Sequence, residues 1–296
     1  MVLIWALNFI IGKVALDHIE PLTLASFRVV LAAILLTPIY ALRAGRQKFS
    51  RHDLGTFAWL GLLGVAGNQM LFTVGLNYTT AGHSSLVIAT GPIAILLLAS
   101  LRGLESLTTK KVSGMALCFA GVTLLALEHG LKLQGGTLAG DLITLTGTMA
   151  FAVYAVLAKK VASQYDTIAM NFFNFAFGAL MVLPIAVWRG RELDWAAVPW
   201  QGWAGLVYMS LFASVIAYLI YYWGLKYLAA SRMAAFSYFL PVIAVWLGIL
   251  LRGEPATMQL FGGGALILVG VYLTELHTSP ADEDDELPDE TRGSDA

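Results

Sequence analysis

Long apolar runs separated by short polar loops make up almost the whole chain. None of the runs alternates apolar and polar positions as the strands of a membrane barrel do, so we expect α-helices. A helix needs about 20 apolar residues to cross a bilayer, and most runs reach roughly that length. The predicted spans are residues 2–16, 22–42, 56–76, 80–101, 112–128, 138–158, 167–188, 202–224, 229–251 and 257–275. The pattern predicts an all-α integral membrane protein with ten transmembrane helices, of which the first is short for a full crossing.

The composition supports the membrane class. Hydrophobic residues make up 58% of the 296 residues, charged residues make up 12%, and the mean hydropathy is +0.74. A soluble domain carries about a quarter charged residues, so a soluble fold is excluded. The single cysteine, Cys118, lies in an apolar run and allows no internal disulfide. The N-terminal run lacks a basic leader and a cleavage site, so we interpret it as a membrane helix rather than a signal peptide.

Basic residues gather in alternate loops. Eleven of them lie in or beside the connections after the second, fourth, sixth and eighth spans, whereas the opposite loops hold four. Because cytoplasmic loops are enriched in Lys and Arg, we expect a multi-pass protein of the cell (inner) membrane with both termini in the cytoplasm. The segment 277–296 is acidic and lacks aromatic residues, and it is predicted to be a disordered cytoplasmic tail.

The chain contains an internal repeat. Its second half matches its first half without a gap over the segments that begin at Gly75 and Gly224, and more weakly nearer the start of each half. The coinciding pairs include Pro92/Pro241, Glu105/Glu254, Gly114/Gly263 and Gly121/Gly270 at an offset of 149 residues, and Lys13/Lys159, Phe27/Phe173 and Pro38/Pro184 at an offset of 146. We therefore expect two five-helix units, at residues 1–130 and 131–276.

An odd number of crossings places the second unit upside down relative to the first. The two units are then an inverted-topology repeat, related by a pseudo-two-fold axis in the membrane plane. Such a pair can rock between two related conformations, one open to each side of the membrane. This is the geometry of alternating access, in which the substrate is held near the midplane between the repeats.

Residues 1–275 resemble the drug/metabolite transporter superfamily, specifically its EamA-type exporters. The resemblance depends on a W-x-x-N-F motif at Trp5, Asn8 and Phe9, the stretch 21–33, and the tyrosine-alanine hairpins, prolines and glutamates that recur in both halves. It implies an exporter of small metabolites such as amino acids or drug-like solutes, and it leaves the substrate open. We expect the recurring prolines to kink the fourth and ninth spans, and Glu105 and Glu254 to stabilise helix N-termini.

Polar and aromatic side chains recur inside the predicted spans. Lipid cannot hydrogen-bond them, so they must face protein or water. One interpretation is that they join neighbouring helices. The other, which we favour for the set, is that they line a wet pathway for a substrate. The substrate-pathway candidates are Trp5, Asn8, Asn68, Gln69, Thr73, Thr80, His83, Ser84, Tyr154, Ser214, Tyr218, Tyr222, Ser237 and Tyr238.

Few ionisable groups lie within the spans. His83 is the titratable member of the hydroxyl-rich stretch 79–85, where it could bind substrate, sense protons or pack between helices. We expect Arg28 to extend its long side chain back to the membrane surface, with a functional role as the alternative; Lys13 is ambiguous in the same way. No carboxylate falls in the middle of a span, so proton coupling through a carboxylate is disfavoured.

Other functions fit the sequence less well. The stretch GHSS at 82–85 lacks the closing glycine of a nucleophile elbow, and no zinc-protease or phosphate-loop motif occurs. We therefore expect no enzyme, no catalytic residue, no metal site and no cofactor. A channel or facilitator is the main alternative to a transporter. The expected partners are the lipid bilayer and a small organic solute, without nucleic acid; the sequence does not indicate an oligomeric state.

Overall fold

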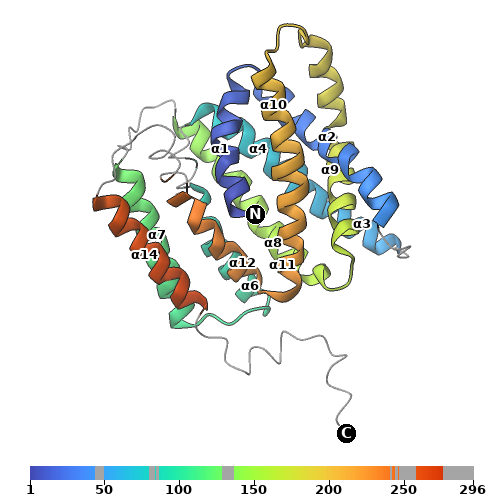
Figure 1. The fold of residues 1–296 in the computed structure, drawn as a ribbon. Helices are drawn as coiled ribbons and strands as arrows, with labels where there is room; N and C mark the ends of the chain where they lie inside the picture. The colour runs from blue at the N-terminus through green and yellow to red at the C-terminus, as the bar shows by residue number, and fades with distance from the viewer. Residues whose placement is uncertain are drawn as a thin grey trace.

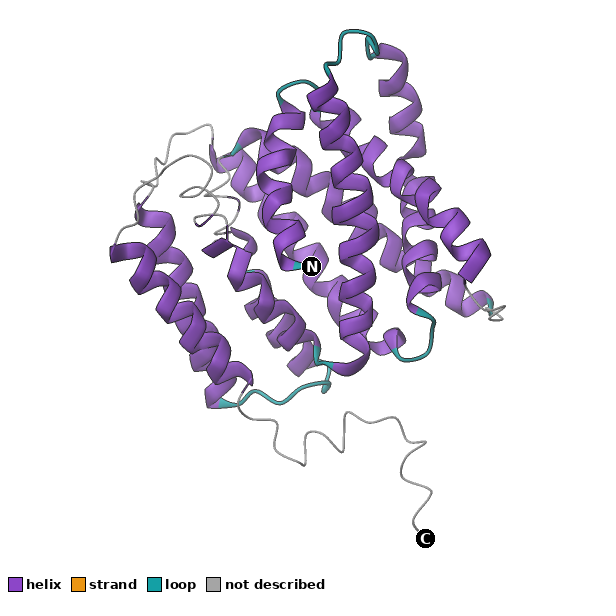
Figure 2. Ribbon diagram, in the orientation of Figure 1, coloured by secondary structure: helices purple, strands orange, loops and turns teal. Residues whose placement is uncertain are grey.

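The computed structural model describes residues 1–43, 50–79, 84, 87–128, 137–240, 242–243, 246 and 258–275, and every regular element in them is helical (Figure 1, Figure 2). The elements are α1 (Val2–Leu16), α2 (Pro21–Arg43), α3 (Arg51–Leu60), η1 (Gly61–Gly67), α4 (Asn68–Tyr78), α6 (Gly91–Leu101), α7 (Thr109–Glu128), α8 (Thr137–Ala162), α9 (Thr167–Glu192), α10 (Trp200–Tyr208), η2 (Met209–Ile216), α11 (Ala217–Tyr227), α12 (Ala230–Ala235), η3 (Phe236–Tyr238) and α14 (Met258–Glu275).

Each of the ten predicted spans contains helix, which confirms the predicted all-α membrane architecture. Within the described residues, five continuous stretches of helix are long and apolar enough to cross a bilayer, namely residues 21–43, 53–78, 138–162, 167–192 and 200–227. Large apolar side chains such as Trp59, Leu180 and Phe261 are exposed on the outer faces of these and other helices. A bilayer is the solvent in which such a surface is stable.

Three spans differ from the continuous helices that the sequence predicts. The third and eighth spans each change to a wider π-helix in the middle, as η1 and η2, and then return to α-helix. In the fourth span, α6 begins only at Gly91, after a turn at residues 89 and 90. Pro92 therefore lies in the first helical turn, where its missing N–H is not needed, so the predicted mid-helix kink at Pro92 is wrong. Pro241, Glu254 and segment 277–296 lie outside the described residues.

One end of the bundle gathers the ends of α2, α8 and α11. Tyr40, near the end of α2, stacks on Phe172, near the start of α9, with ring centroids 4.4 Å apart. The Nζ atom of Lys159, near the end of α8, donates to the carbonyl of Leu228, just after α11, at 2.9 Å. We call this the basic end, because the adjoining loops carry most of the basic residues.

The opposite end gathers the ends of α1, α4 and α9. Lys13 of α1 donates to the carbonyl of Thr79, just after α4, at 2.8 Å. Arg189, near the end of α9, forms an ion pair with Glu20, just before α2, at 3.5 Å. Successive spans therefore run in alternating directions, as a multi-pass membrane protein requires.

Two lysines at equivalent positions of the two repeats make equivalent hydrogen bonds. Lys13 donates to the carbonyls of Leu76 and Thr79. Lys159, which follows at the offset of 146, donates to the carbonyls of Leu225 and Leu228, which follow at the offset of 149. The same contact thus occurs once in each repeat, at opposite ends of the bundle. This is the relationship that an inverted repeat requires.

Helices α7 and α14 are related to each other by the same symmetry. These two helices lie side by side at one edge of the molecule (Figure 1). A Cβ atom added at Gly114 would lie 2.7 Å from the carbonyl oxygen of Gly270, and one added at Gly121 would lie 2.6 Å from that of Gly263. Because Gly114 corresponds to Gly263 and Gly121 to Gly270, the repeat exchanges the two contacts. The pseudo-two-fold axis therefore passes between these antiparallel helices, whose backbones touch because the residues are glycines.

Candidate functional site

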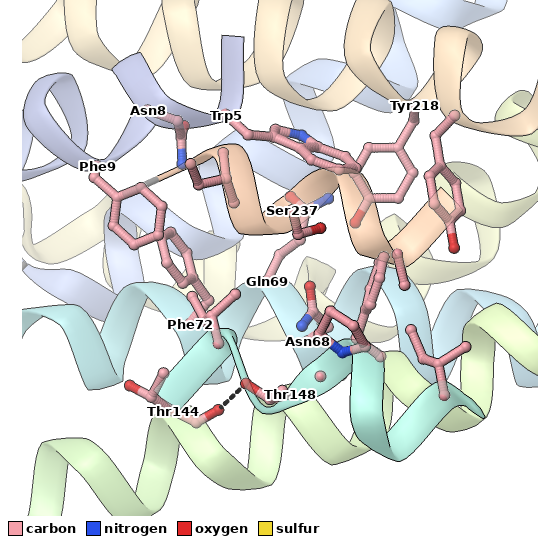
Figure 3. A pocket seen from close by; sticks show the side chains of 18 of the residues that line it. Trp5, Asn8, Phe9, Asn68, Gln69, Phe72, Thr144, Thr148, Tyr218 and Ser237 are labelled. Carbon is pink, nitrogen blue, oxygen red and sulfur yellow. Dashed lines mark hydrogen bonds between the residues drawn. The ribbon is translucent and has the colours of Figure 1, made fainter. Parts of the chain in front are cut away.

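A cavity of about 120 Å³ lies between the two repeats (Figure 3). Its wall comes from α1, α2, α4 and α6 of the first repeat and from α8, α11, α12 and η3 of the second. The structure places six of the predicted pathway residues on this wall, namely Trp5, Asn8, Asn68, Gln69, Tyr218 and Ser237. These residues are far apart in sequence and meet because α1, α4, α11 and η3 converge on the same space.

Aromatic rings form much of the wall. Trp5 lies 5.8 Å from Tyr218 and 5.9 Å from Tyr221 between ring centroids, and Phe9 contacts Phe72 edge to face at 5.4 Å. The rings hold one another in place and give the cavity an apolar face. An apolar body of a ligand would find complementary surface here.

The π-helical segments expose backbone carbonyls toward this site. The hydroxyl of Tyr218 donates to the carbonyl of Gly64 in η1 at 3.1 Å, and the indole Nε1 of Trp5 donates to the carbonyl of Ala213 in η2 at 3.1 Å. Gly64 and Ala213 are equivalent at the offset of 149. A wide turn alters the regular backbone ladder, and a carbonyl inside a membrane protein needs a donor. The two aromatic donors therefore fix both the π-segments and the cavity wall.

Arg28 contributes the cavity's buried positive charge. Its residue is 3% exposed, and its Nε atom donates to Ser214 Oγ at 3.0 Å. Ser214 Oγ in turn lies 2.9 Å from the carbonyl oxygen of Met209 and 3.2 Å from Gln69 Oε1. The expectation that Arg28 reaches back to the membrane surface is therefore wrong: the side chain points inward from α2, because Ser214 on η2 receives it.

Four polar atoms on the cavity wall are buried without a partner in the described part of the protein. They are Asn8 Oδ1, Arg28 Nη1, Gln69 Nε2 and the Tyr221 hydroxyl oxygen. A buried polar atom that makes no hydrogen bond is costly, so each is a point at which a ligand or water is expected to bind. Within the described part of the chain, Arg28 makes no ion pair, and the other residues on the wall are uncharged.

The remaining predicted residues that the structure describes lie away from the cavity wall. Tyr154 donates to Tyr222, which also accepts from Asn174 Nδ2 at 2.8 Å. This network joins α8, α11 and α9, as hydrogen bonds between helices do. Thr73, Ser84 and Tyr238 are buried elsewhere, Ser214 supports Arg28 from behind the wall, and Thr80 and His83 lie outside the described residues.

Several wall residues are absent from the predicted set. Thr144 and Thr148 line the cavity although their hydroxyls donate to carbonyls one turn earlier in α8, those of Gly140 and Thr144 (Figure 3). Phe72 and Phe151 carry no sequence signal, because an apolar residue within a membrane span looks the same whether it faces lipid or a cavity. Arg28 does carry a sequence signal, because it is a charged residue within an apolar run.

No metal centre is found among the residues that the structure describes. No group of three or more His, Cys, Asp or Glu side chains there is arranged to hold an ion. The wall instead combines one guanidinium, a few amide and hydroxyl groups and many aromatic rings. Such a wall can bind and orient a small organic molecule, and it offers no nucleophile paired with a base.

The chain is similar to known transporters along most of its length. The profile of the EamA-like transporter family matches residues 1–127 and 138–276. An uncharacterized transporter of Archaeoglobus fulgidus is 29% identical, over 92% of this chain and 93% of its own. A probable terminal-alkyne amino-acid exporter of Streptantibioticus cattleyicolor is 26% identical, over 94% of this chain and 91% of its own.

The fold also occurs in a solved structure. One crystal structure superposes with a TM-score of 0.74 over 93% of both chains, at 20% sequence identity. At that identity, the likeness concerns the arrangement of the helices and not the ligand. The cavity residues must therefore be interpreted from this chain alone.

Proposed function

This chain belongs to the EamA-like transporter family, and we propose that it is a secondary transporter that exports small organic solutes by alternating access. The substrate is held between the two repeats, in the cavity beside Trp5 and Tyr218. Because no carboxylate falls in the middle of a predicted span, transport in this proposal runs down a solute gradient, by exchange or by coupling through His83.

The observation that carries the proposal is the position of the cavity at the boundary between the repeats. Its wall combines elements of both, so a relative motion of the repeats changes access to the cavity without dismantling either unit. Its volume of about 120 Å³ is close to the roughly 150 Å³ of an engineered protein cavity that binds benzene. A solute of modest size, such as a small amino acid or organic acid, fits that space.

The repeats also supply a physical reason for two conformations. Each repeat contains the same lysine contact, at opposite ends of the bundle, and the same π-helical interruption in the middle of its third span. Contacts that close one end therefore have counterparts that can close the other, and the two closed forms have similar energies. Alternating access follows if the substrate is bound in both.

The orientation completes the proposal. The basic end faces the cytoplasm of the cell (inner) membrane, because positively charged loops are retained on that side. Both termini are then cytoplasmic, and residues 1–130 and 131–276 act as the two moving units. The bilayer surrounds the exposed apolar faces, and the solute is the partner that enters the cavity.

Counterflow in proteoliposomes tests the function. The purified protein is placed in vesicles preloaded with a defined mixture of amino acids, organic acids, amines and sugars. Uptake of each labelled solute is then measured. A carrier shows uptake that is accelerated by the same solute inside, whereas a channel shows no such acceleration. Absence of counterflow for every member of the mixture would contradict the proposal.

Substitutions on the wall link the flux to the cavity. Tyr218→Ala and Gln69→Ala remove one aromatic and one amide group from the wall, and each is expected to lower counterflow about tenfold or more. Tyr78→Ala is the matched control, because that tyrosine is 56% exposed at the end of α4, away from the cavity. Equal flux in all three variants would remove the cavity from the pathway.

A further inference from the structure

We propose that Arg28 binds the carboxylate of the transported solute, so that the substrates are small organic carboxylates with an apolar body. The inference rests on the proposed function, and it names the chemical class that the cavity selects. Its starting point is a difference between the two repeats at three equivalent positions.

In the second repeat these positions form a hydrogen-bonded cluster. Tyr154 and Asn174 both donate to the hydroxyl of Tyr222, and all three residues are buried. Only Asn174 Oδ1 in this cluster is left without a partner. The cluster therefore holds α8, α9 and α11 together with little left to offer a ligand.

In the first repeat the equivalent positions are polar but are not bonded to one another. The offsets of 146 and 149 place Asn8, Arg28 and Thr73 at the positions of Tyr154, Asn174 and Tyr222, respectively. Each of the three has a buried atom without a protein partner, namely Asn8 Oδ1, Arg28 Nη1 and Thr73 Oγ1. Asn8 and Arg28 also line the cavity. One repeat thus has a structural cluster, whereas the other presents two of the three equivalent residues, Asn8 and Arg28, to the cavity.

The guanidinium of Arg28 is positioned for an anion. Ser214 holds Nε at 3.0 Å, which fixes the plane of the group and leaves Nη1 free to donate. A planar, oriented guanidinium matches the two oxygens of a carboxylate with a pair of parallel hydrogen bonds. A buried positive charge without a counterion is also costly, and an anionic ligand would offset that cost.

The rest of the wall selects what is attached to the carboxylate. Among the described residues that line the cavity, only Arg28 is charged, so an organic cation would meet its repulsion without compensation there. Rings such as Trp5 and Phe151 provide apolar surface for a hydrocarbon body. Asn8 Oδ1 can accept one hydrogen bond from an ammonium or hydroxyl group of the solute. Both neutral amino acids and simple carboxylic acids satisfy this pattern.

Three solutes with the same hydrocarbon body separate the possibilities. Leucine carries both charged groups, isocaproate carries only the carboxylate, and isoamylamine carries only the amine. Each is tested in wild-type vesicles as an inhibitor of counterflow of a solute from the defined mixture. Binding of each is also followed by the thermal unfolding midpoint of the detergent-purified protein. We expect leucine or isocaproate to inhibit at concentrations about 10- to 100-fold lower than isoamylamine, as one or two charge-assisted hydrogen bonds predict.

Variants of Arg28 assign the preference to this side chain. Arg28→Gln removes the charge, and Arg28→Lys keeps the charge without the planar pair of donors. We expect Arg28→Gln to abolish the preference for solutes with a carboxylate and Arg28→Lys to retain part of that preference. Arg189→Gln is the matched control, since it removes an arginine of α9 that forms ion pairs with Glu20 and Glu192 outside the cavity. The unfolding midpoint of each ligand-free variant verifies that it is folded.

The outcomes separate this inference from the function on which it rests. If the protein carries out counterflow but prefers solutes without a carboxylate, or if Arg28→Gln keeps the wild-type preference, the inference is overturned and the transporter function stands. If wild-type protein shows no counterflow for any solute, both fail together. A carboxylate preference that is lost in Arg28→Gln and kept in Arg189→Gln supports the inference.

Discussion

Glu105 accepts two hydrogen bonds from Ser231 across the boundary between the repeats, one from the backbone N–H at 3.1 Å and one from the side-chain hydroxyl. Lys111 Nζ lies 3.3 Å from the same carboxylate, whose side chain is 3% exposed. Ser231 lies in the first turn of α12, so the carboxylate also faces the positive end of that helix. The sequence predicted a helix N-terminus for Glu105, and the structure places it at α12 rather than at the following α7.

We expect this contact to hold the basic end closed. In Glu105→Gln the charge is lost, and the charge-assisted bonds to Ser231 and Lys111 become weaker ones. The labelling rate of a cysteine at the buried position Ala229, in a Cys118→Ala background, should rise about tenfold, which corresponds to about 1.4 kcal/mol. Glu192→Gln, in an exposed pair at the opposite end, should leave the rate unchanged. An equal rate in wild type and Glu105→Gln would show that the contact does not control access.

The contacts of Lys159 predict that its substitution lowers stability, whereas substitution of the neighbouring Lys160 does not. Lys159→Met removes the donor from the carbonyls of Leu225 and Leu228, at a cost of about 1–3 kcal/mol if they find no other donor. The thermal unfolding midpoint in detergent should fall by roughly 2–8 °C. Lys160→Met changes an exposed residue and should leave the midpoint within about 2 °C of wild type. If both variants unfold together, the contact is not stabilising.

Much of the fold could be predicted because the bilayer restricts it. A chain in lipid must satisfy its backbone within each span, so long apolar runs can be assigned to helices from composition alone. The inverted repeat was visible because pairs such as Lys13 and Lys159 kept both their identity and their spacing. The same pairs occupy equivalent contacts in the structure, so the sequence match and the symmetry have a common physical basis.

The cavity could be predicted only in part, for reasons that individual residues make clear. Arg28 was expected to reach the surface, since a long side chain can do so and the sequence does not reveal that Ser214 receives it. Phe151 looks like any lipid-facing residue until α8 is placed against α11. The two π-segments, GLLGVAG and MSLFASVI, have no sequence motif in common, so we attribute the wide turns to packing.

The close packing of glycines between α7 and α14 predicts different effects of two glycine-to-alanine substitutions on the thermal unfolding midpoint. A Cβ at Gly121 would lie 2.6 Å from the carbonyl oxygen of Gly263, so Gly121→Ala must separate the helices and should lower the unfolding midpoint by several degrees, roughly 1–3 kcal/mol. At Gly264 no atom lies within 4 Å of an added Cβ. Gly264→Ala should leave the midpoint unchanged or raise it, since alanine favours a helix over glycine by about 1 kcal/mol. Equal effects at both sites would contradict the close packing.

The last prediction concerns the direction in which the chain crosses the membrane. Ser163 and Asp194 are exposed at opposite ends of α9, whose 26 residues span about 39 Å. Cysteines placed singly at these positions, in a Cys118→Ala background, should react with a membrane-impermeant maleimide from opposite sides. In intact cells the cysteine at 194 should be labelled and the one at 163 protected until the membrane is opened, because the basic end faces the cytoplasm. The reverse pattern would overturn the orientation alone. Labelling of both from the same side would overturn the inverted repeat, and the cavity would then no longer lie between two units that can move in opposite directions.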